Sequence, residues 1–182
     1  MNLVPSPAPE PLSDDAAAAM VEVLQRHRVA FVLIGGFAIQ LHGVDGLGRT
    51  ADLDVTPSRT AENLRRLASA LTELDARLRG AGLPDEGLEV PWHADLLARM
   101  ELAVNLITKF GPLDISLRPS GTEGYEDLAR EAVDLALGDR VAPTAALADI
   151  VRSKEAAGRE KDVLALPTLE RHLRASRERG DA

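Results

Sequence analysis

The sequence predicts an α/β or α+β fold, with a small mixed sheet flanked by helices and a C-terminal helical portion. Short apolar runs rich in β-branched residues, such as residues 29–34, alternate with longer segments whose leucines recur at helical spacing, as in residues 61–78. This alternation is typical of one sheet covered by helices. The length of 182 residues suits one domain, or one domain with a small annex.

The individual elements follow from apolar spacing and from start and stop signals. Helices are expected at residues 16–28, 37–42, 61–78, 143–157 and 159–175, and strands at 29–34, 53–55, 102–108 and 113–117, with a smaller hairpin at 132–136 and 140–142. Ser13 is a suitable N-cap for the first helix, and residues 109–112 carry a turn signal. Pro167 should break the last helix, because proline lacks a backbone N–H.

The composition excludes several classes of protein. Apolar residues make up 45% and charged residues 27%, as in globular proteins, and the net charge is -8. An acidic body repels polyanions at long range, and an aromatic content of 3% leaves few side chains for base stacking. The chain has no cysteine, no long apolar stretch and no secretion signal, which fits a cytoplasmic protein without a membrane segment.

A glycine pair, Gly35-Gly36, lies where the strand at 29–34 meets the short helix that follows. Glycine lets the backbone approach a ligand closely, and a helix N-terminus offers free N–H groups to a phosphate. Glycine pairs are also common in ordinary turns, so this pair alone does not identify a site.

Three aspartates carry the strongest chemical signal. Asp52 and Asp54 alternate along the second strand, which should point both carboxylates the same way and Leu53 into the core. Adjacent carboxylates repel unless a cation lies between them, and Mg²⁺ takes such ligands together with substrate phosphates. Asp114, on a later strand, could complete the set, with Ser116 on the same face. Each of these side chains is equally consistent with a solvated strand edge.

Taken together, Gly35-Gly36, the segment 49–54 and the segment 113–115 resemble the nucleotidyltransferase superfamily with the DNA polymerase β-like fold. Asp52 lies 16 positions after Gly36, and Asp114 lies 60 positions after Asp54, which fits that pattern. One departure is Phe37, since many relatives have a serine after the glycine pair. The backbone amides would then have to carry the phosphate contact.

The C-terminal segment 149–162 resembles the Lys, Ala-Gly-Arg and Lys-Asp helix pair of minimal nucleotidyltransferases, including the AbiEii-type toxins of toxin–antitoxin systems and their mycobacterial members. Lys154 lies on an apolar helical stripe, so it either snorkels to solvent or meets an anion. The resemblance makes it a contact to the triphosphate, with Arg159 as a second one. Asp162 would orient either cation, or simply pair with Arg159 at i,i+3.

The resemblance implies roles for specific residues. The catalytic set is Asp52, Asp54, Asp114 and Lys154; the metal ligands are Asp52, Asp54 and Asp114; the nucleotide contacts are Gly35, Gly36, Arg49, Thr50, Lys154 and Arg159; and the orienting residues are Asp162 and Ser116. Pairing with a nearby aspartate is an equal alternative for Arg49. The cofactor would be Mg²⁺, with Mn²⁺ as an alternative ion, and a nucleoside triphosphate would be the substrate.

Residues 1–12, with four prolines among small and polar residues, predict a flexible tail. The same resemblance implies a nucleotidyltransferase core at 13–120 and a C-terminal helical portion at 121–182 that completes the nucleotide site. It also implies a toxin that transfers a nucleoside monophosphate to the 3′ end of tRNA, blocks aminoacylation and translation, and has a cognate antitoxin as its partner. Two alternatives stay open. One is an enzyme of the same fold that modifies a protein or a small molecule, and the other is a non-catalytic interaction module.

Overall fold

The computed structural model describes residues 10–101 and 103–179; most of the predicted tail and position 102 of one predicted strand lie outside the described residues. The helices are α1 (Asp14–Arg26), α2 (Gly35–Leu41), α3 (Ala61–Glu73), α4 (Ala94–Ala98), α5 (Tyr125–Leu128), α6 (Leu147–Ala157) and α7 (Glu160–Arg179). The strands are β1 (Phe31–Ile34), β2 (Leu53–Pro57), β3 (Arg77–Leu78), β4 (Leu88–Glu89), β5 (Val104–Thr108), β6 (Gly111–Ile115), β7 (Val133–Leu137) and β8 (Arg140–Thr144).

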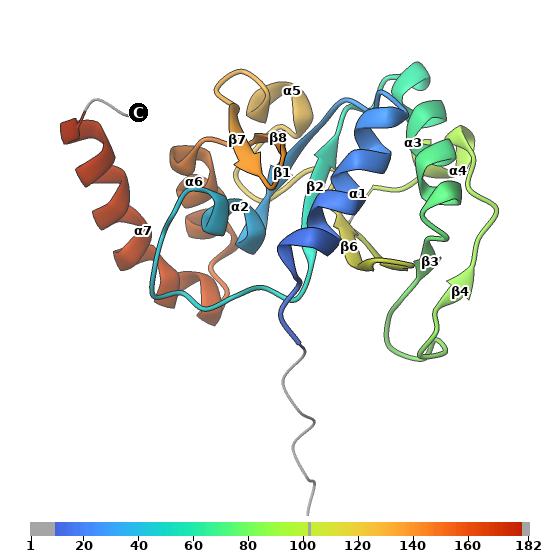
Figure 1. Cartoon of the computed structure of the whole chain (residues 1–182), viewed down its shortest axis with the longest axis horizontal. Coiled ribbons are helices and arrows are strands. Elements are labelled where there is room, and N and C mark those ends of the chain that lie inside the picture. The colour runs from blue at the N-terminus through green and yellow to red at the C-terminus, as the bar shows by residue number, and fades with distance from the viewer. Residues whose placement is uncertain (1–9, 102, 180–182) are drawn as a thin grey trace, which may run out of the picture.

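The strands form one mixed sheet in the order β4-β3-β5-β6-β2-β1-β8-β7. In Figure 1 the α6–α7 pair lies at one end of the molecule, α3, α4, β3 and β4 lie at the other, and β1, β2 and β6 lie between them. This arrangement confirms the predicted mixed sheet flanked by helices. Strands β7 and β8, from the predicted C-terminal portion, belong to the same sheet as the predicted core.

The core forms around the middle of this sheet. Leu53 and Val55 of β2 and Leu113 and Ile115 of β6 are almost fully buried, and they sit side by side because these two strands are parallel. Side chains alternate between the two faces of a strand, so the residues between them point to the opposite face. That opposite face carries the candidate site.

The sequence prediction of a helix over 61–78 is wrong at its C-terminal end. Helix α3 ends at Glu73, Leu74 caps it, and Asp75 has a φ of 50°, which a helix cannot accommodate. Leu78 then pairs with Leu106 in β3–β5. The leucine spacing continues past the helix because Leu78 of the strand that follows packs, partly buried, against the same core.

The predicted break at Pro167 is also wrong, because α7 passes through this residue. A helical proline leaves the carbonyl four residues earlier without its partner. Here that carbonyl belongs to Val163, and both Val163 and Pro167 are exposed residues, so the proline lies on the solvent side of the helix.

The predicted tail over residues 1–12 is one residue too long, because the Leu12 side chain is buried and its backbone N–H donates to the carbonyl of Thr50 at 2.8 Å. The chain is therefore tied to the loop before β2 from this point onward. Among the helices that the structure describes, none combines the length and apolar character needed to cross a membrane.

Candidate active site

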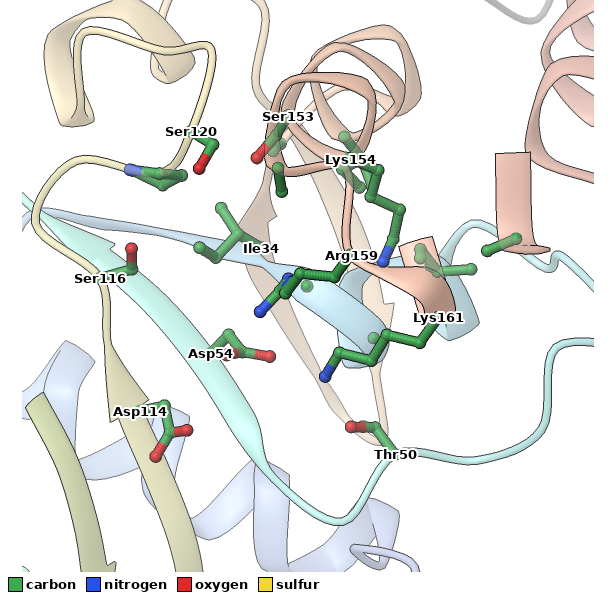
Figure 2. A pocket seen from close by; sticks show the side chains of 18 of the residues that line it. Ile34, Thr50, Asp54, Asp114, Ser116, Ser120, Ser153, Lys154, Arg159 and Lys161 are labelled. Carbon is green, nitrogen blue, oxygen red and sulfur yellow. The ribbon is translucent and has the colours of Figure 1, made fainter. Parts of the chain in front are cut away.

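Strand pairing places two of the predicted aspartates next to each other. Asp54 of β2 and Asp114 of β6 are register partners in a parallel pair, between the buried pairs formed by residues 53 and 113 and by residues 55 and 115. Their side chains therefore share the face of the sheet opposite the core. Figure 2 shows both carboxylates on neighbouring strands at one wall of a pocket.

The glycine pair lies directly against these acids. Ile34 at the end of β1 is the register partner of Asp54, so the chain turns into α2 beside that carboxylate. Gly35 has a φ of 70°, and a Cβ on it would lie 2.1 Å from Oδ2 of Asp54. A Cβ on Gly36 would lie 2.8 Å from Cβ of Thr50. Only glycine fits here, which gives the pair a structural reason that the sequence alone could not supply.

Asp54 carries an unbalanced negative charge. Burial and the charges of Asp52 and Asp114 together raise its pKa to about 7, although Lys161 and Lys154 act in the opposite direction. Among the described residues, no side chain forms a hydrogen bond or ion pair with this carboxylate. A partly buried carboxylate with like-charged neighbours and no partner is a favourable place for a cation.

Asp52 and Asp114, by contrast, already have partners. Asp52 precedes β2, and its Oδ1 accepts a hydrogen bond from the hydroxyl of Thr50 at 2.6 Å. Nη2 of Arg79 lies 2.8 Å from Oδ1 of Asp114 and 3.7 Å from Oδ2 of Asp52. Burial raises the pKa of Asp114, and Arg79 counteracts that rise. Sequence reasoning missed Arg79, because its partners lie 27 and 35 positions away and no local motif marks it.

The opposite wall of the pocket comes from the two C-terminal helices. Lys154 of α6 donates from Nζ to Oδ1 of Asp162 at 2.7 Å, and Arg159 donates from Nε to Oδ2 at 2.5 Å. The Asp162 side chain is fully buried, which by itself would raise its pKa, but these two hydrogen bonds hold the pKa below its ordinary value. Both predicted pairings of Asp162 thus occur together, and Asp162 joins the two helices.

Lys161 received no role from the sequence, although it lies within the quoted C-terminal motif. In Figure 2 its side chain and that of Arg159 extend from the α6–α7 segment toward Asp54 and Thr50. These residues line a cavity of about 890 Å³ together with the glycine pair and the three aspartates. One wall of the cavity is therefore acidic and the other basic, which suits a metal ion on one side and phosphates between them.

The remaining predicted residues, Arg49 and Ser116, also have partners within the protein. Arg49 lies at the cavity but pairs with Asp14 at 2.5 Å, which is the alternative that sequence reasoning left open for it. The Ser116 backbone N–H donates to the carbonyl of Val55, and its side chain lines the cavity just beyond the end of β6.

The residues present fit a divalent ion only in part. Across residues 10–101 and 103–179, no group of three His, Cys, Asp or Glu side chains is arranged to hold one ion. The sequence expectation that Asp52, Asp54 and Asp114 converge on shared ions is therefore not met by the side chains as they stand. The physical reason is Arg79, whose guanidinium lies against two of the three. Asp54 does fit such an ion, because its carboxylate has no hydrogen-bond or ion-pair partner among the described residues and lies against the backbone of Gly35.

Comparison with known proteins agrees with this architecture. No protein-family model matches the chain, and no curated protein matches it. Among solved structures, the lincosamide antibiotic adenylyltransferase LnuA with bound lincomycin has a TM-score of 0.60 at 12% identity, over 88% of this chain and 98% of LnuA. ANT(2")-Ia in complex with adenylyl-2"-tobramycin has a TM-score of 0.54 at 15% identity, over 92% and 99%. TM1012 of Thermotoga maritima has a TM-score of 0.53 at 16% identity, over 88% and 92%. The chain therefore has the nucleotidyltransferase fold.

Proposed function

We propose that this protein is a metal-dependent enzyme that transfers a nucleoside monophosphate from a nucleoside triphosphate to an acceptor hydroxyl. The observation that carries the proposal is the two-walled cavity. Asp54 and Asp114 form its acidic side, Arg159 and Lys161 its basic side, and the glycine pair lies at the junction. Phosphoryl transfer needs little covalent chemistry from the protein, but it needs positioning and neutralisation of charge, which such a cavity supplies.

Different side chains would bind the phosphates and the metal ion. Arg159 and Lys161 would hold the β- and γ-phosphates, with Lys154 and Asp162 keeping the α6–α7 junction in place. Asp52 and Asp54 would hold Mg²⁺ or Mn²⁺, which when bound neutralises phosphate oxygens and makes the α-phosphorus more electrophilic.

In the transfer step Asp114 would accept the proton of the acceptor hydroxyl. The acceptor oxygen then forms a bond to the α-phosphorus, and the bond to the bridging oxygen breaks on the opposite side. The leaving group is pyrophosphate. The cations of the α6–α7 segment would neutralise its negative charge.

For the acceptor we propose the 3′ end of tRNA, which would make the protein a toxin with a cognate antitoxin. The motif resemblance supports this choice, and so do exposed arginines on the outer part of α7. Arg171, Arg174 and Arg177 are exposed and spaced three residues apart, so they lie near one another on the helix surface. Such a row could contact an RNA backbone despite the acidic net charge.

A small hydroxyl-bearing molecule is the second candidate acceptor, and the structural comparison favours it. LnuA is an antibiotic adenylyltransferase, and ANT(2")-Ia was solved with adenylyl-2"-tobramycin. The cavity of about 890 Å³ has room for a small molecule beside a nucleotide.

One experiment separates these acceptors. The protein is incubated with Mg²⁺, each α-³²P-labelled nucleoside triphosphate, and either total tRNA or a panel of small-molecule alcohols that includes aminoglycosides and lincosamides. Label in tRNA supports the toxin, and label in a small molecule supports the second candidate. The Asp52→Ala and Lys154→Ala variants should transfer no label. Absence of label in every acceptor, together with absence of nucleotide binding, would contradict the proposed activity.

A further inference from the structure

Arg79 is a fixed cation between two carboxylates of the site. It follows β3, where its backbone N–H donates to the carbonyl of Asn105 at 2.9 Å. Its Nε donates to the carbonyl of Leu106 at 3.1 Å, so β5 holds both the backbone and the guanidinium. These two anchors leave the outer nitrogen Nη2 directed at the acids of β2 and β6. The guanidinium is thus held in place by the sheet and does not depend on the acids alone.

The contacts of Arg79 decide which carboxylate oxygens remain available. Nη2 is 2.8 Å from Oδ1 of Asp114 and 3.7 Å from Oδ2 of Asp52, so these two oxygens face the same positive group. The other oxygen of Asp52 accepts the hydroxyl of Thr50. An ion shared by Asp52 and Asp114 would have to enter where the guanidinium lies. Asp54 is the one member of the three without such a partner among the described residues.

We propose that the guanidinium of Arg79 is a built-in counter-cation that replaces one of the two divalent ions, so that the protein binds a single divalent ion, centred on Asp54. This inference deepens the proposed function and rests on it for the nature of the site. The charges agree with it: three carboxylates and one guanidinium leave two negative charges, which one divalent ion balances. A second divalent ion would leave a net positive cluster beside the partly exposed guanidinium of Arg79.

The position of Arg79 in the fold indicates that its contact with Asp114 persists when a nucleotide is bound. It comes from the β3–β5 side of the sheet, whereas the cations proposed to hold phosphates, Arg159 and Lys161, come from the α6–α7 connection and the start of α7. A nucleotide bound between the two walls would therefore leave the contact between Arg79 and Asp114 intact.

The number of bound Mn²⁺ ions tests this proposal without any measurement of activity. Free Mn²⁺ is counted by electron paramagnetic resonance during titration of the natural protein and of Arg79→Met, with the Asp54→Asn protein as the measure of surface binding. The natural protein should bind one ion beyond that background. Arg79→Met should bind two, the first about tenfold more tightly, because removing a unit charge a few ångströms from a divalent ion is a large electrostatic change.

Two further variants separate the role of Arg79 from a general charge effect. Arg77→Met removes the same charge two residues earlier, in β3, where the partners are Asp75 and Glu89, and should still bind one ion. Arg79→Lys keeps the charge and should also bind one. Thermal unfolding followed by circular dichroism checks that each variant is folded.

The possible counts give distinct conclusions. Two ions in the natural protein, or one in both the natural protein and Arg79→Met, would overturn the role of Arg79 while leaving the proposed transferase intact. No ion in either protein would overturn both this inference and the metal-dependent part of the proposed function. The count in the natural protein tests the inference even if Arg79→Met fails to fold.

Discussion

Replacing Asp54 with asparagine should make the metal-free protein more stable while abolishing nucleotidyl transfer. The carboxylate is partly buried beside two other acids, and its folded-state pKa is raised from 3.8 to about 7. The ionised form is therefore a cost to the folded state at neutral pH. Asparagine has nearly the same shape and carries no charge, so it removes that cost.

The magnitude follows from the two pKa values. Below pH 3.8 the carboxyl is protonated in both the folded and the unfolded protein, and the charge costs nothing. As the pH rises toward 7, the unfolded chain ionises first, so the free energy of unfolding of the natural protein falls relative to that of the variant. Above pH 7 the full difference is reached, which is at most about 4 kcal/mol. We expect a gain of about 2 to 4 kcal/mol at pH 8, or about 5 to 15 °C in Tm.

The assay is thermal and urea-induced unfolding at pH 5 and pH 8, with a chelator and with added Mg²⁺. The variant should gain more at pH 8 than at pH 5, and Mg²⁺ should stabilise the natural protein but not the variant. Asp114→Asn is the matched control, because it leaves Arg79 without its charge partner and so should gain less or lose stability. A variant less stable than the natural protein at pH 8 in chelator would refute this reasoning.

Three other substitutions test parts of the site. Gly35→Ala should lose transfer activity and at least about 1 kcal/mol of stability, because its Cβ would meet Asp54; Gly138→Ala, at a similar φ of 63° with open space around it, isolates the backbone contribution. If Gly35→Ala and Gly138→Ala lose the same stability in unfolding experiments, the close contact between Gly35 and Asp54 is not the cause of the loss. Asp162→Asn should cost about 3 to 5 kcal/mol in urea unfolding, because it leaves two cations without their buried partner; a loss below 1 kcal/mol would count against its role as a structural joint. Lys161→Ala should weaken nucleotide binding in calorimetry about tenfold with an unchanged Tm, consistent with loss of one charged phosphate contact; unchanged affinity would exclude that contact.

The parts of the fold that could be predicted are those determined by local patterns. The apolar runs located β1, β2 and β6, and the alternation of Leu53 with its flanking acids identified which side chains leave the core. The end of α3 could not be placed, because leucines continue into β3 at the same spacing and nothing local marks Asp75 as left-handed. The passage of α7 through Pro167 places this proline on an exposed side of the helix, which is a tertiary property.

The site was predictable where it depends on spacing along the chain. The glycine pair, the three aspartates and the Lys154–Asp162 contact lie where a resemblance in motif spacing suggests. Arg79 was not predictable, since its position beside the acids results from the order β3-β5-β6-β2 in the sheet. Lys161 lies in a recognisable motif, but only the geometry shows that its side chain extends into the cavity. The strand order of the sheet thus determines which cation lies beside the acids, and motif spacing along the chain does not reveal it.

The most direct test of the account is the binding of a non-hydrolysable nucleoside triphosphate analogue by isothermal titration calorimetry, with and without Mg²⁺, for the natural protein and for Asp54→Asn. The account predicts binding by the natural protein that requires Mg²⁺, and at least about tenfold weaker binding by the variant in Mg²⁺. Equal affinities for the two proteins, or binding that is unaffected by a chelator, would contradict the claim that the acidic wall of this cavity holds a metal–nucleotide complex.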